Sequence, residues 1–163
     1  MLTVMLATAA LLPGQTQNQC AEALASAQTN FNCYWGDWSQ AKRDEYNADY
    51  NWEAAKASYR ALRPFMKPED VQLADTTETV GDQADGAMVS YWDQVDIDES
   101  NAYSALDQAY AAFGRGTYPT CMSFCETTQA CVKDGYQNME QMYVSYNALQ
   151  AYTNYLLQIL NKY

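Results

Sequence analysis

The chain has 163 residues, a formal net charge of −11, five cysteines and no histidine. Its length fits a single domain, and a hydrophobic fraction of 48% is enough for a packed core. The absence of histidine removes the commonest general base, transition-metal ligand and haem ligand, so we expect no catalytic residues, no metal and no cofactor. The acidity, without a basic stripe, argues against nucleic acid as a partner.

Residues 1–14 form an apolar N-terminal segment that runs from Leu2 to Leu12 before Pro13 and Gly14. The run is shorter than the roughly 20 residues that a membrane-spanning helix needs. It resembles the apolar region of a secretory signal, although no Lys or Arg precedes it. Two interpretations stay open: an export signal, or a retained arm that is buried in a neighbouring subunit or in a membrane. Membrane contact is expected only through this segment, if it is retained.

Residues 17–63 predict one long helix, because apolar residues recur there in steps of three and four. Gly36 is the weak point of this leg, where we expect a kink or a break. Pro64 ends the leg, because a helix usually stops before a proline. Pro68, followed by two acidic residues, then indicates a new helix start.

The middle leg, residues 68–113, is less regular than the first. Residues 96–99 indicate a joint, with Asp96 or Asp98 capping a new helix, so the leg is either continuous or split into two helices. Gly114, Gly116 and Pro119 mark the clearest turn in the chain.

The last leg, from about residue 120 to residue 160, has the most regular helical pattern, with steps that average 3.5 residues. No segment alternates with period two, so we expect no sheet. Legs of matching length joined by tight turns fold back on each other most simply as an up-down-up bundle. The predicted fold is therefore an all-α, elongated bundle of three helical legs, cross-linked by disulfides, in one domain over residues 15–163.

The five cysteines fall in two clusters, one near the start of the first leg and one near the start of the third. Cys20 and Cys33 would lie about 20 Å apart on an unbroken helix, too far for a bond, which needs Cα atoms within about 7 Å. With parallel first and third legs, Cys20 pairs with Cys121 and Cys33 pairs with Cys131. Cys125 is then either a buried free thiol or an intermolecular bond. Antiparallel legs would instead pair Cys20 with Cys131 and Cys33 with Cys121.

Disulfides of this kind place the protein outside the reducing cytosol, in an extracellular, cell-surface, periplasmic or lumenal location. Charge is also segregated along the chain, because no Lys or Arg lies between Pro68 and Gly114, whereas six cations lie in residues 42–67. The acidic stretch is either a solvated face that favours solubility or a docking face for a basic neighbour, such as residues 42–67 of another copy.

Tryptophan and tyrosine at helical spacing more often form a core or an interface than a ligand groove. The interface candidates are Trp35, Trp38, Trp52, Tyr143 and Tyr146. We expect a non-enzymatic, exported structural or assembly protein that self-associates, or that is a subunit of a larger extracellular or surface assembly such as a filament. Its partner is protein, in a homo-oligomer or larger assembly. The alternative is a secreted helical binding module that holds a small or extended ligand against Tyr and Trp side chains.

Overall fold

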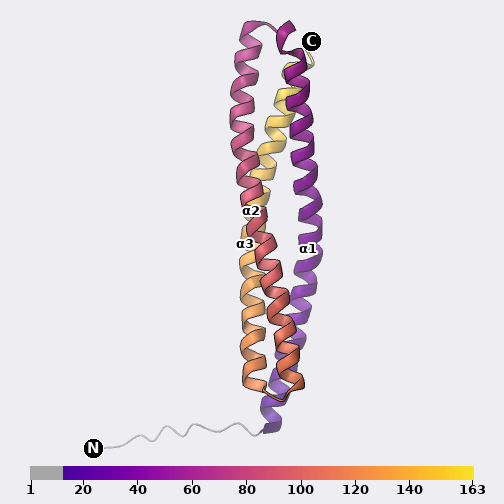
Figure 1. The fold of residues 1–163 in the computed structure, drawn as a ribbon, viewed down its shortest axis with the longest axis vertical. Coiled ribbons are helices and arrows are strands. Elements are labelled where there is room, and N and C mark those ends of the chain that lie inside the picture. The colour runs from indigo at the N-terminus through magenta and orange to yellow at the C-terminus, as the bar shows by residue number, and fades with distance from the viewer. Residues whose placement is uncertain (1–12) are drawn as a thin grey trace, which may run out of the picture.

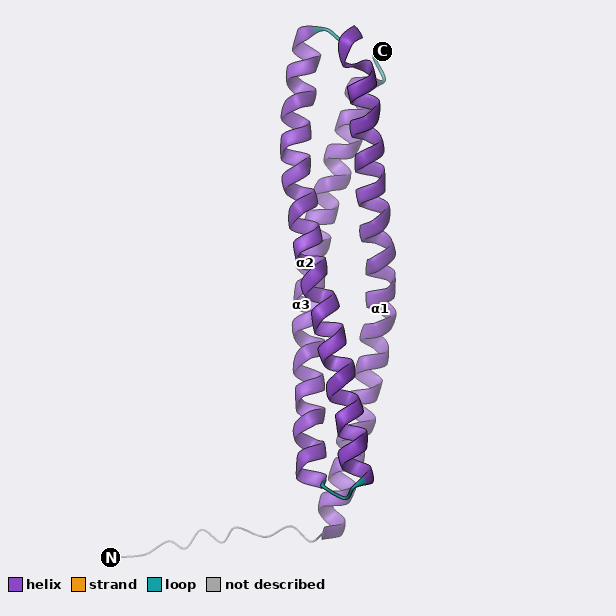
Figure 2. Ribbon diagram, viewed as in Figure 1, coloured by secondary structure: helices purple, strands orange, loops and turns teal. Residues whose placement is uncertain are grey.

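The structure, a computed structural model, describes residues 13–163, which form an elongated rod of three long helices (Figures 1 and 2). The helices are α1 (Pro13–Leu62), α2 (Pro68–Gly114) and α3 (Tyr118–Leu160), and a short 3-10 turn, η1 (Arg63–Phe65), follows α1. The helices α1 and α3 run parallel and α2 runs antiparallel to both (Figure 1). No strand occurs in residues 13–163. The predicted all-α, up-down-up bundle is confirmed.

The helix ends lie where proline and glycine predicted them. Pro64 lies in the turn that follows α1, and Pro68 and Pro119 lie in the first turns of α2 and α3, where a missing amide proton costs nothing. Gly116 has a φ of 73°, a left-handed conformation that glycine adopts without the steric cost of a Cβ. This residue therefore allows the tight turn between α2 and α3.

Two predicted interruptions do not occur. The helix α1 continues through Gly36, and α2 continues through residues 96–99 as a single helix. An exposed glycine costs a helix only about 1 kcal/mol, which the packing of a long helix offsets. The side chain of Asp98 caps no helix; it is buried and accepts a hydrogen bond from Asn138 of α3 at 2.8 Å. That contact ties α2 to α3 at the place where a joint was expected.

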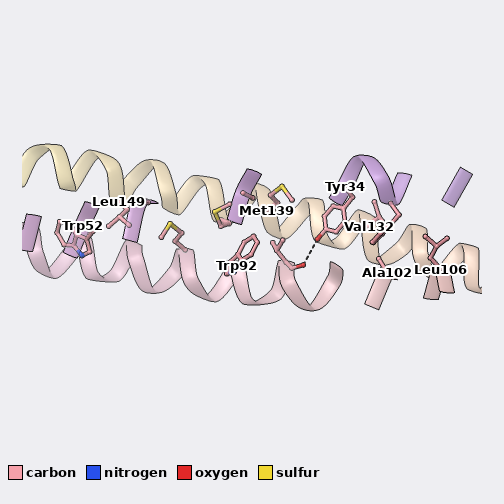
Figure 3. Packing of buried hydrophobic residues seen from close by; sticks show 14 of the residues in the cluster. Tyr34, Trp52, Trp92, Ala102, Leu106, Val132, Met139 and Leu149 are labelled. Atoms are coloured by element: carbon pink, nitrogen blue, oxygen red, sulfur yellow. Dashed lines mark hydrogen bonds between the residues drawn. The ribbon is translucent and has the colours of Figure 1, made fainter. Parts of the chain in front are cut away.

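The core is a thin layer of side chains between the three helices (Figure 3). Tyr34 of α1 inserts its ring between the other helices, and its hydroxyl donates to the Val95 carbonyl at 3.0 Å. A Cβ on Gly135 of α3 would overlap this ring, and a Cβ on Gly81 of α2 would overlap the ring of Trp52. Two glycines therefore make the space that two large, fully buried rings occupy.

Three ion pairs join the end of α1 and η1 to α2 near the α1–α2 turn. As the cations advance along the chain, their carboxylate partners on α2 recede by the same number of residues, as an antiparallel pair of helices requires. The pairs are Lys56–Asp82 (2.8 Å), Arg60–Glu78 (3.3 Å) and Arg63–Asp75 (3.0 Å). Three of the six cations in residues 42–67 thus form ion pairs with carboxylates of α2, which leaves fewer of them for the acidic stretch of another copy.

No helix of the described part of the chain is long and apolar enough to cross a membrane. The predicted export signal or retained arm falls mostly on residues 1–12, which lie outside the described residues. Only its last two residues, Pro13 and Gly14, belong to the structure, where they start α1.

Candidate interaction surfaces

The disulfide between Cys20 and Cys121 is present, with Cα atoms 6.3 Å apart and both residues fully buried. It joins the first turns of α1 to the start of α3, so the predicted pair and the parallel direction of these helices are confirmed. A covalent bond here fixes the register between the two helices.

The second predicted bond is wrong, because Cys33 and Cys131 are both free. The two cysteines match in height along the rod, but at 3.6 residues per turn Cys33 is rotated about 220° around α1 from Cys20 and lies exposed. Burial, and then the nearby charges of Asp98 and Asp134, raise the pKa of the half-buried Cys131 thiol. Cys125 is a buried free thiol whose pKa is raised by burial.

Two tyrosines of α3 hold α1 through hydrogen bonds to carboxylates. Tyr136 donates to Asp37 at 2.8 Å, and Tyr143 donates to Asp44 at 2.8 Å, one heptad further along both helices. Burial and the bonded carboxylate raise the pKa of Tyr136 to about 12, and they raise the pKa of Tyr143 as well. Both phenols therefore remain protonated donors through the neutral range, and the two pairs share one register between α1 and α3, with a sequence separation of 99 each.

Further along α1 and α3, the facing side chains are smaller, and the surface between the two helices forms a groove of about 400 Å³. One heptad beyond Asp44 and Tyr143 lie Asn51 and Gln150, and no ring covers the space between the helices there. We call this feature the α1–α3 groove. Its lining residues, none of them ionisable, are Ala48, Asn51, Ala54, Ala55, Ser58, Gln150, Thr153, Asn154 and Leu157.

Five aromatic rings lie between α1 and α2, of which Phe31 and Trp92 are buried, Trp38 is half-buried, and Trp35 and Tyr103 are exposed. Trp35 stacks on Trp38 with ring centroids 6.4 Å apart, and Trp38 lies 5.9 Å from Trp92 of α2. Phe31 lies 6.0 Å from Tyr103 of α2. We call these five rings the aromatic face. Trp35 is 52% exposed and Tyr103 is 61% exposed, so large apolar surfaces are held in contact with solvent.

Of the predicted interface candidates, Trp35 and Trp38 lie in the aromatic face. Tyr143 and Tyr146 lie on α3, where both are half-buried and pack edge to face at 5.7 Å. The structure therefore does not bring the tyrosine candidates and the tryptophan candidates together on one surface.

Trp52 is a correction, because it is a fully buried core residue and offers no surface to a partner. Its ring fills the space left by Gly81, and its indole Nε1 donates to Asp82 at 2.9 Å. The sequence grouped Trp52 with the other tryptophans by its helical spacing. Its ring is instead buried, because Gly81 on the facing helix leaves room for it in the core.

Carboxylates also gather between α1 and α2. Burial, and then the charges of neighbouring carboxylates, raise the pKa of Glu45 and of Asp85. Glu45 and Asp85 therefore hold their protons to a higher pH than free carboxyl groups do. No group of three or more ionisable side chains within residues 13–163 has an arrangement that could hold a metal ion.

Comparisons with known proteins identify no relative: no family model, no curated protein and no solved structure matches the chain.

Proposed function

We propose that the protein is a non-enzymatic structural subunit that self-associates into a larger assembly, such as a filament, outside the reducing cytosol. The aromatic face carries this proposal, because Trp35 and Tyr103 keep more than half of their surface in solvent. Tryptophan and tyrosine are enriched at protein interfaces, where they supply much of the binding energy. Exposed apolar surface beside a packed core is a common feature of sites that contact protein.

The shape of the molecule supports lateral contact between copies. At about 1.5 Å per residue, the 47 residues of α2 extend about 70 Å, and the aromatic face lies along the side of this rod. The buried disulfide supports a location where thiols are oxidised. Extended sides that carry exposed rings allow neighbouring copies to pack against one another.

A ligand-binding module is less well supported. The α1–α3 groove has a volume in the range of small-molecule sites, but its lining contains no tyrosine or tryptophan, which that function was expected to use. A second hollow, beside Phe31, Tyr103 and Tyr110, has rings but a volume of only about 180 Å³. Neither hollow combines aromatic rings with a volume that a small-molecule ligand needs, so self-association is the better supported function.

Sedimentation equilibrium over a range of concentrations tests the proposal. We expect the parent protein to increase in mass with concentration, and the double variant Trp35→Ser/Tyr103→Ser to associate at least tenfold more weakly, a loss of about 1.4 kcal/mol. Tyr155→Ser is the control, because Tyr155 is an exposed tyrosine on α3, outside the aromatic face. A parent protein that stays monomeric at every concentration contradicts the proposal.

A further inference from the structure

We propose that the α1–α3 groove binds the N-terminal segment, residues 1–12, of a second copy of this chain. The inference rests on the proposed self-association and names one contact that would build it. It uses a surface separate from the aromatic face, since the groove lies between α1 and α3 and the rings lie between α1 and α2.

The chemistry of the groove selects an uncharged occupant. Its lining has no ionisable side chain, although the chain as a whole carries a net charge of −11. Small side chains such as Ala54 let another segment approach closely, and Leu157 offers apolar contact. The amides of Asn51 and Asn154 can donate to and accept from a peptide backbone, which would otherwise be buried without partners.

Residues 1–12 match this chemistry. The segment has no charged residue, and apart from two threonines its side chains are all apolar. An occupant with a carboxylate or an ammonium group would lose part of its hydration in the groove, and no lining residue carries an opposite charge to compensate. The neutral segment avoids that cost and buries apolar side chains that water would otherwise surround.

The reach of the segment excludes the groove of its own copy. With a rise of about 1.5 Å per residue, Ala48, at the near edge of the groove, lies about 52 Å along α1 from Pro13. Twelve residues, even fully extended, span at most about 42 Å. The start of α1 and the α1–α2 turn lie at opposite ends of the rod (Figure 1). Only a second copy can therefore bring residues 1–12 to the groove.

The dimensions allow the contact in trans. The groove extends from Ala48 to Ser58, about 15 Å along α1, which about five extended residues can cover. The remaining residues of the segment are available to bridge the two copies. Because donor and acceptor lie at opposite ends of the rod, the contact either propagates head to tail or closes a pair of antiparallel rods.

Matched variants of the full chain test the inference by sedimentation equilibrium. The arm variant, Val4→Asp/Leu6→Asp, puts charge on the segment, and the groove variant, Ala54→Glu, puts charge in the groove. Ala57→Glu is the control, because Ala57 is exposed on the same helix but does not line the groove. We expect the arm and groove variants each to associate at least tenfold more weakly than the parent, and the control to match the parent.

Mixing the two defective variants adds a readout that misfolding cannot imitate. The arm variant retains a normal groove, and the groove variant retains a normal segment, so one contact can form between them. We expect the mixture to form heterodimers at concentrations at which each variant alone is monomeric. Circular dichroism should show the same helix content for all four proteins, since Ala54 and Ala57 are both exposed.

Two results overturn the inference while leaving the proposed function standing. One is an arm variant and a groove variant that both associate as strongly as the parent. The other is a native protein that is oligomeric although its mass shows that it begins after residue 12. A parent protein that never associates is a different outcome, because it removes the proposed function and this contact together.

Discussion

Two glycines determine how tightly the helices of this rod can approach. Gly135 faces the buried ring of Tyr34, and Gly81 faces the buried ring of Trp52. Alanine is better than glycine within a helix by about 1 kcal/mol, so helix propensity does not account for these glycines. Their value lies in the missing Cβ, because each ring occupies the volume that a larger residue would need.

Gly135→Ala should therefore destabilise the protein, by about 1–3 kcal/mol in the free energy of unfolding, because overpacking of a rigid ring outweighs the gain in helix propensity. Gly86→Ala is the matched control, because Gly86 is exposed on α2 with no atom near the position of a Cβ. The control should stabilise the protein by about 0.5–1 kcal/mol. Urea unfolding measures both changes, and stabilisation by both variants would contradict the packing of Tyr34 on Gly135.

At the scale of the helices, α1 is joined to α3 by a covalent bond at one end and by hydrogen bonds along its length. The disulfide closes a loop with a sequence separation of 101, so it should restrict the unfolded chain strongly. Replacing both cysteines, as Cys20→Ala/Cys121→Ala, should lower the free energy of unfolding by about 2–5 kcal/mol. Chemical denaturation measures the loss. Cys33→Ala should change it by less than about 0.5 kcal/mol, because Cys33 is exposed and free.

The hydrogen bond from Tyr136 to Asp37 makes the α1–α3 contact sensitive to alkaline pH. The folded-state pKa of Tyr136 is about 12, above its ordinary value near 10, so the folded protein holds this proton more tightly than the unfolded chain does. Its contribution to stability is complete below about pH 10 and is lost as the pH rises toward 12. Urea unfolding at a series of pH values, from about 9 to about 11.5, measures this loss of stability. We expect the free energy of unfolding to fall less steeply with pH in Tyr136→Phe than in the parent protein. An equally steep loss in the variant would contradict the assignment.

The ends of the helices could be predicted from sequence because they depend on local residues. Pro64, Pro68 and Pro119 restrict the backbone wherever they occur, and Gly116 supplies the left-handed turn. The continuity of α2 could not be predicted in this way, because the packing of Asp98 against Asn138 of another helix overrides the local signal for a joint.

Spacing along the chain was not enough to predict which side chains pair between the helices. Cys20 and Cys121 were identified by matching heights, and both are fully buried between the helices. Cys33 and Cys131 also match in height but stay free, because a matching height does not bring an exposed Cys33 into the contact between the helices. The α1–α3 groove was missed, although its signal is present in the sequence. Asp37 and Asp44 on α1 pair with Tyr136 and Tyr143 on α3 at a spacing of one heptad. One heptad further along both helices, the pair is replaced by Asn51 and Gln150, which line the groove.

At the scale of the whole molecule, charge opposes association. Each copy carries a net charge of −11, so two copies repel at low ionic strength. Four of its nine cations, Lys56, Arg60, Arg63 and Lys162, form ion pairs within the chain. The surfaces proposed for association are the aromatic face and the neutral groove, and neither depends on attraction between opposite charges.

Added salt should therefore strengthen self-association, because it shortens the range of the repulsion from about 30 Å at 0.01 M to about 3 Å at 1 M and leaves the apolar contacts intact. Sedimentation equilibrium in sodium chloride at constant pH measures the change, which we expect to be several-fold or more in the association constant. Docking of the acidic stretch on the basic residues of another copy predicts the opposite trend, since screening weakens such pairs. Unfolding measured in the same salt series separates the effect on ion pairs within the chain from the effect on contacts between copies.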